Sequence, residues 1–127
     1  MDRAIPSSLA IADVLAAELE PLGAWPPGVE PISGAPEAFA LELFNDGHVQ
    51  SGIWECTPGS FPSRRAGCCE LMHFVAGAAT ITDTDGTVRD IRPGAMVFVP
   101  DGWQGTWQIR TTVRKTYTIT QTDLTRE

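Results

Sequence analysis

The feature that most constrains the fold is a series of short apolar segments, each of which ends in a turn sequence. From residue 38 onward, stretches rich in β-branched and aromatic residues alternate with Gly, Pro and Asp at spacings of about 8–10 residues. Short strands that follow one another without intervening helices predict an all-β antiparallel sandwich or barrel and exclude a parallel α/β fold. The predicted strands lie in AFALELF, HVQSGIWEC, ELMHFVAG, AATITDTDG, TVRDIRPG, AMVFVPDG, QGTWQIRT and VRKTYTIT.

The N-terminal segment has a different pattern. Ser7 or Ser8 can cap a helix, four apolar residues between positions 9 and 19 fall on roughly one helical face, and Pro21 stops the run. This pattern predicts a short helix over about residues 8–20.

The stretch that follows is dense in Pro and Gly, and we expect an extended arm that packs on the body through Trp25. The predicted organisation is therefore a helix and arm over residues 1–37 and one globular β unit over residues 38–127.

Charge and cysteine content exclude several classes of function. A net charge of −7 and the absence of a basic stripe argue against a nucleic-acid partner. No apolar run approaches the ~20 residues that span a bilayer, so we expect no membrane partner. The odd set of Cys56, Cys68 and Cys69, two of them adjacent, is not a disulfide framework, and we expect a cytoplasmic location.

Two segments resemble the cupin jelly roll. Gly94, Pro100 and Gly102 in GAMVFVPDGWQG fit the second cupin motif, and Glu70 and Gly77 in ELMHFVAG fit the end of the first. The phrases GIWECTPGSF, PDGWQGTWQI and VRKTYTI look like the small single-domain cupins of the ureidoglycine aminohydrolase cupin-domain family. The resemblance covers about residues 40–120 and implies a double-stranded β-helix, or jelly-roll barrel.

The metal site that the resemblance implies is largely missing. A cupin site combines about three imidazoles with one carboxylate, but Ser63, Arg65 and Gly105 stand at the histidine positions of the general motifs. In the aminohydrolase pattern Glu70 and Gln104 match ligand positions.

The other two positions of that pattern hold Arg64 and Ala66, neither of which binds a cation. We therefore expect no cofactor, with a divalent metal on Glu70 and Gln104 as the minor alternative.

A thiolate zinc site is a further alternative, opposed by strand alternation. Cys68 and Cys69 are neighbours on a predicted strand, so their side chains point to opposite faces and only one can serve a given site. By the same alternation His73 lies opposite Glu70, and we expect it to pack between the barrel and a neighbouring layer. Cys56 is expected to pack as a small hydrophobic residue.

Glu70 is the central candidate residue. It is either a remnant of the motif, paired with Arg64 or Arg65, or a catalytic group on the barrel lining whose pKa is raised by burial. The two arginines are either solvated loop residues, or one of them turns inward and recognises a planar anion. Arg65 is the candidate for this role.

The last predicted strand offers further candidates. Lys115 and Tyr117 share a face with Ile119. If that face is inward, Lys115 requires a carboxylate partner, such as Glu70 or Glu55, or an anionic ligand. If the face is outward, Lys115 is a solvated edge charge.

The tryptophans form either an aromatic cage or core anchors. Trp107 shares strand parity with Gly105 and is the best candidate for a cavity wall, whereas Trp54 and Trp103 remain open between the two interpretations. Gln104 is added to the candidate ligand contacts.

The sequence thus favours a small-molecule site for a polar or anionic metabolite, with Glu70 and Lys115 as catalytic candidates and Arg65, Gln104, Trp107 and Tyr117 as substrate-binding candidates. An enzyme of this kind would perform hydrolysis, isomerisation or another proton-transfer reaction. A divergent metal-dependent aminohydrolase and a non-catalytic structural or sensory module are the alternatives. We expect a homodimer, since small open sandwiches commonly cover an exposed edge or face.

Overall fold

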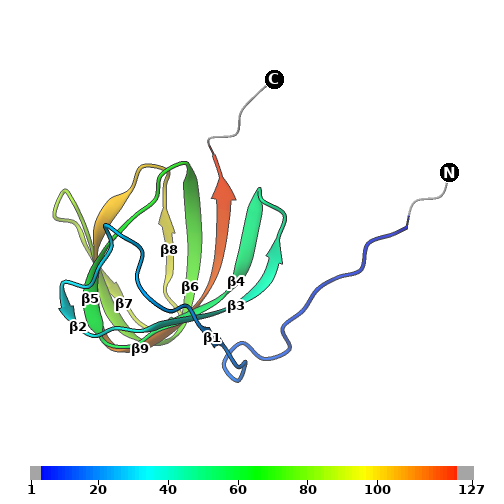
Figure 1. Ribbon diagram of the computed structural model, residues 1–127, viewed down its shortest axis with the longest axis horizontal. Helices are drawn as coiled ribbons and strands as arrows, with labels where there is room; N and C mark the ends of the chain where they lie inside the picture. Colours follow the sequence, from blue (N-terminus) through cyan, green and yellow to red (C-terminus); the bar gives the residue numbers. More distant parts are fainter. Residues whose placement is uncertain (1–3, 123–127) are drawn as a thin grey trace.

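The computed structural model describes residues 4–122 as a single curled β-sheet with an N-terminal arm (Figure 1). Within that range no α-helix is present, and therefore no helix that could cross a membrane. The strands are β1 (Glu20–Pro21), β2 (Ser33–Gly34), β3 (Ala38–Asn45), β4 (Val49–Cys56), β5 (Gly59–Arg64), β6 (Cys68–Asp83), β7 (Val88–Ile91), β8 (Met96–Val99) and β9 (Gln104–Gln121).

All the strand pairs are antiparallel, as the sequence predicts. One path runs β1-β3-β4-β9-β5-β2, and β6 joins it by pairing with β9 while also holding β7 and β8. Because β9 pairs with β4, β5 and β6 along its length, it connects both walls of the barrel-like body (Figure 1).

The long strands β6 and β9 differ from the sequence prediction, which divided each of them into two shorter segments. β6 bends without ending, through register shifts between Phe74 and Ala79. Gly77 lies at this bend with φ of +88°, and a Cβ there would collide with the backbone of Thr112 and Val113. Gly77, which in the sequence appears to end a strand, is therefore the point where β6 bends and continues into the second wall of the barrel.

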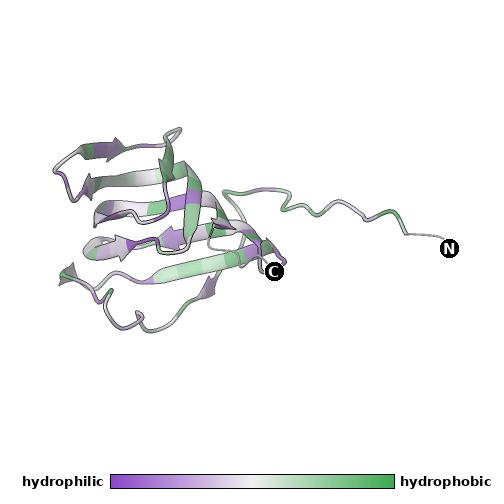
Figure 2. Ribbon diagram, turned by 90° about the horizontal axis from the view of Figure 1, so that it is seen from above, coloured by the Kyte–Doolittle hydropathy of each residue, from purple (hydrophilic) through white to green (hydrophobic). Residues whose placement is uncertain are grey.

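The core lies inside the curl and follows strand alternation. Along β6, Glu70, Met72 and Phe74 are buried, whereas Leu71 and His73 are exposed. Figure 2 shows hydrophobic and hydrophilic residues alternating along several strands, as expected for a sheet with one buried face. The prediction of which β6 residues share a face is confirmed.

Two expectations about packing have different outcomes. Cys56 is fully buried in the core cluster, as expected. His73 was expected between two layers, and this is wrong: within residues 4–122 nothing covers it, so it lies exposed on the outer surface of the sheet beside Leu71, Met96 and Phe98.

The predicted helix over residues 8–20 is not formed. The segment is extended and contains one turn, in which the carboxylate of Asp13 accepts hydrogen bonds from the N–H groups of Leu15 and Ala16. Figure 1 shows the first part of the arm running away from the body, so the start of a helix there would have had no surface on which to pack its apolar face. Instead, Arg114 of β9 donates to the carbonyl groups of Val14, Leu15 and Ala17.

The later part of the arm packs as expected. The indole of Trp25 lies 4.7 Å from the ring of Phe61 and donates a hydrogen bond of 2.9 Å to the Pro36 carbonyl. The short strands β1 and β2 attach the arm to β3 and β5.

Candidate functional site

A cavity of about 480 Å³ opens between the arm and the inner face of the barrel. Its walls are largely aromatic. Trp54 and Trp107 lie 5.6 Å apart edge to face, and Phe61 lies 5.9 Å from Trp107 in a stacked arrangement. Trp25, on the arm, closes the outer side against Phe61.

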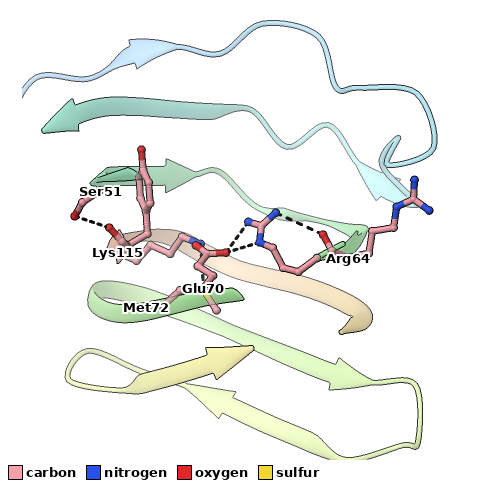
Figure 3. Close-up of polar contacts among 7 residues, drawn as sticks. Ser51, Arg64, Glu70, Met72 and Lys115 are labelled. Atoms are coloured by element: carbon pink, nitrogen blue, oxygen red, sulfur yellow. Dashed lines mark hydrogen bonds and ion pairs between the residues drawn. The ribbon is translucent and has the colours of Figure 1, made fainter. Parts of the chain in front are cut away.

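A buried ion cluster forms the charged part of this cavity (Figure 3). Glu70 is only 3% exposed, and its two carboxylate oxygens have different partners. Oε1 accepts hydrogen bonds from Arg65 Nε at 2.9 Å and from the terminal Nη2 at 2.5 Å. Oε2 accepts one from Lys115 Nζ at 2.8 Å. Two cations therefore share one anion, which leaves one positive charge uncompensated within the cluster.

Lys115 is 4% exposed and has further contacts. Its Nζ atom lies 3.1 Å from Met72 Sδ, and 4.6 and 4.9 Å from the ring centroids of Trp54 and Trp107. The indole faces attract the ammonium group through their negative quadrupole. Lys115 therefore lies on the inward face, with Glu70 as its carboxylate partner.

The pKa values reflect this asymmetry. Burial alone would raise the pKa of Glu70, but the attraction of Lys115 and Arg65 together outweighs it and lowers that pKa. Burial lowers the pKa of Lys115, and the nearby Arg65 adds to this effect while Glu70 opposes it. The directions are compatible because Glu70 has two cationic partners, whereas Lys115 is fully desolvated and shares its one anion. Of the two alternatives for Glu70, the raised pKa is therefore wrong, whereas the pairing with Arg65 is confirmed.

The loop between β5 and β6 holds Arg65 in place through its backbone. The N–H of Arg65 donates to the Trp103 carbonyl, and the Gly102 N–H donates to the Arg65 carbonyl, both at 2.8 Å. Asp101 fixes the next turn by accepting a hydrogen bond from the Gly67 N–H at 2.8 Å. Backbone groups in and beside the second cupin motif thus position Arg65, which stands in the segment of the first motif.

The structure brings together five of the six predicted site residues. Glu70, Lys115, Arg65, Trp107 and Tyr117 all line the large cavity. Gln104 does not. It is exposed at the start of β9 and borders a separate hollow of about 310 Å³, and the exposed Arg64 borders both hollows.

Some lining residues were not predicted as part of a site. Phe61 and Trp25 line the cavity, and only the isolated Trp25 in a Pro-rich arm gave a signal in the sequence. Trp103 lies over Gly105, where a Cβ would also come within 2.5 Å of the Thr82 carbonyl oxygen. The indole of Trp103 thus covers the position of the motif-two histidine, and it is held there by a 2.9 Å hydrogen bond to Asp83.

These side chains do not fit a cupin metal centre. Both oxygens of Glu70 are bound to cationic side chains. Arg65, whose guanidinium is not a metal ligand, stands at one of the histidine positions of the cupin motifs. Across residues 4–122 no three His, Cys, Asp or Glu side chains converge on one point. An additional cation beside Arg65 and Lys115 would be repelled.

The family model for the EutQ-like cupin domain matches residues 43–117. The chain belongs to the EutQ-like cupin family. Its matched segment contains Glu70, Arg65, Trp107, Lys115 and Tyr117. No curated protein sequence matches the chain.

Solved structures share this fold. A protein of unknown function of the DUF861 family from Pseudomonas syringae pv. tomato is 30% identical over 83% of this cupin, with a TM-score of 0.72. This cupin spans 45% of the length of that protein.

More distant structures show the fold alone. EutQ from Clostridium difficile is 18% identical, with a TM-score of 0.60, over 71% of this chain and 72% of its own. A predicted oxalate decarboxylase from Thermotoga maritima is 15% identical, with a TM-score of 0.66, over 88% of this chain and 99% of its own.

Proposed function

We propose that this cupin binds a small organic anion with an apolar or aromatic body in the cavity between the arm and the barrel. The observation that carries the proposal is the ion cluster, in which Arg65 and Lys115 share the single carboxylate of Glu70. A carboxylate ligand would supply the missing negative charge. Burying the ligand carboxylate there is favourable because it meets cationic donors instead of an apolar wall.

The donors of Arg65 support this mode of binding. A guanidinium has five N–H donors. The contacts with Glu70 and the Arg64 carbonyl use three of them. The side chain is 29% exposed and borders the cavity, so its remaining donors are within reach of a ligand.

The shape and walls of the cavity define the rest of the ligand. A volume of about 480 Å³ lies within the range of pockets for small molecules. The aromatic rings of Trp54, Phe61 and Trp107 favour a planar apolar group. A local positive charge inside a chain of net charge −7 also concentrates anions at this one place.

The geometry gives less support to the metal-dependent aminohydrolase alternative. The resemblance to the ureidoglycine aminohydrolase branch places a ligand at Glu70, but that carboxylate is already occupied by two protein cations. A proton-transfer reaction in this cavity would use Lys115 together with Glu70, because the ammonium and the carboxylate lie 2.8 Å apart.

The test compares benzoate with its neutral isostere benzamide. Both fit the same space, and Trp25, Trp54 and Trp107 line the cavity, so intrinsic tryptophan fluorescence reports occupancy. We expect saturable quenching by benzoate that weakens with rising salt, and at least tenfold weaker binding of benzamide. Equal binding of the two, or no binding of either, would contradict the proposal.

A further inference from the structure

The only lysine of the chain is the one buried in the cavity. The nine basic residues are eight arginines and Lys115. The exposed cations, such as Arg92 and Arg110, are all arginines. A guanidinium stays protonated and cannot condense with a carbonyl group, whereas a primary amine can. The sole side chain with that chemistry is thus held in the proposed binding site.

The surroundings of Lys115 suit a nucleophilic amine. Lysine amines are activated by desolvation and by a neighbouring cation. Lys115 is 4% exposed and shares Glu70 with Arg65. Burial, with help from Arg65, lowers the pKa of Lys115, so its ammonium gives up a proton more readily than that of a solvated lysine.

We propose that Lys115 captures the carbonyl carbon of a small oxo acid as an imine. This inference rests on the proposed anion site, because Arg65 would hold the carboxylate of the oxo acid while its carbonyl group reaches Lys115. Arg65 and Lys115 meet opposite oxygens of one carboxylate, so they lie close enough for a short bifunctional molecule.

The step balances through Glu70. The ammonium of Lys115 gives one proton to Oε2, 2.8 Å away, and the amine attacks the carbonyl carbon to form a carbinolamine. As the carbinolamine forms, one proton passes from the nitrogen to the carbonyl oxygen. Glu70 then returns its proton to the resulting hydroxyl group, which leaves as water while the nitrogen lone pair forms the C=N bond. Overall, an ammonium and a carbonyl become a protonated imine and water, and Glu70 is ionised both before and after the reaction.

The product keeps the electrostatic contacts of the starting state. A protonated imine carries the same positive charge as the ammonium, so it retains the ion pair with Glu70. It also remains near the faces of Trp54 and Trp107, where the ammonium now lies 4.6 and 4.9 Å from the ring centroids. Imine formation therefore leaves no buried charge without a partner.

The experiment incubates the protein with pyruvate and sodium cyanoborohydride, which reduces an imine to a stable secondary amine. Intact mass and peptide mapping then locate the adduct, and the N-terminal amine is the one internal comparison. Methyl pyruvate, which has the same carbonyl group but no carboxylate, is the matched probe. We expect a single adduct on Lys115, formed at least tenfold faster by pyruvate.

Variants separate the roles of the two cations. Lys115→Arg keeps the charge and should abolish the adduct at this position. Arg65→Met should slow the reaction of pyruvate more than that of methyl pyruvate, because it removes the carboxylate contact of pyruvate alone, whereas its effect on the Lys115 amine is shared by both probes. Arg92→Gln, which removes an exposed arginine, should change neither. Circular dichroism of each variant reports its folding, and the wild-type map tests the proposal even if a variant unfolds.

The two proposals fail in different ways. Labelling of the N-terminal amine alone overturns imine formation at Lys115. Labelling of Lys115 at the same rate by both probes overturns the selection of an oxo acid through its carboxylate. If benzoate still quenches tryptophan fluorescence in that case, the anion site stands. If benzoate does not bind either, both proposals fall.

Discussion

Replacing Glu70 with Gln should strongly destabilise this cupin, although the shape of the side chain is unchanged. The substitution leaves Lys115, at 4% exposure, buried beside Met72 without its anionic partner. Breaking a buried ion pair from one side costs about 3–5 kcal/mol. That is a large share of the 5–15 kcal/mol that holds a typical domain folded. Arg65 adds little to this cost, because its side chain is 29% exposed and can turn to water.

The opposite substitution, Lys115→Met, should cost less. It leaves Glu70 with the two hydrogen bonds from Arg65, and methionine fills a similar volume beside Met72. The double variant no longer buries the ammonium of Lys115 without an anionic partner, so its stability should exceed that of Glu70→Gln.

Urea unfolding at pH 7 of the wild type, both single variants and the double variant measures this coupling. We expect a coupling energy of about 2–3 kcal/mol. A cost below about 1 kcal/mol for Glu70→Gln, as for an exposed pair, would refute the interpretation of the cluster. A double variant no more stable than Glu70→Gln would refute it as well.

Other predictions concern acid stability, the thiols, the Trp103 contact and assembly. Because the pKa of Glu70 is lowered on folding, its contribution to stability is present above the unfolded pKa of about 4.3 and is lost as the pH falls through the folded pKa. In acid unfolding followed by circular dichroism, the stability of Glu70→Gln should therefore fall less steeply with decreasing pH than that of the wild type. The same pH dependence in both proteins would count against this. Burial raises the pKa of Cys56 to about 12, so this thiol should resist Ellman's reagent at pH 8 until the protein unfolds, while early reaction of all three thiols would contradict its burial. Gly105→Ala should cost about 1–3 kcal/mol in urea unfolding because its Cβ would meet Trp103 and the Thr82 carbonyl, and a neutral effect would show that the indole yields. We also propose a homodimer through the outer surface that exposes Leu71, Met96 and Phe98; light scattering should give twice the chain mass for the wild type and a monomer for Phe98→Glu, and a monomeric wild type would end that proposal.

The strand pattern in the sequence predicted the fold well because it depends on local signals. Alternation correctly placed Glu70 and Met72 on the buried face and Leu71 on the exposed face. It could not show that β6 continues through Gly77, since a glycine looks the same to sequence analysis at a strand end and at a bend. The helix prediction failed because amphipathic periodicity stabilises a helix only where another surface meets it.

Several features of the site depend on tertiary contacts that no single segment contains. Strand parity could place Lys115 on a face but not decide whether that face was inward. The inward turn of Arg65 requires the backbone of Gly102 and Trp103, which lie in a different loop. The lowered pKa of Glu70 requires both cations at once, so a prediction from burial alone gave the wrong direction.

The central claim is that an unbalanced positive charge in the cavity binds an organic anion. Isothermal titration of benzoate into the wild type, Arg65→Met and Arg92→Gln tests it most directly, because both variants remove one arginine and only Arg65 lines the cavity. Charge-assisted hydrogen bonds contribute about 1.5–3 kcal/mol, so Arg65→Met should weaken binding by at least about tenfold. Arg92→Gln should bind like the wild type. Equal affinities in all three proteins, or the absence of binding to the wild type, would contradict the account.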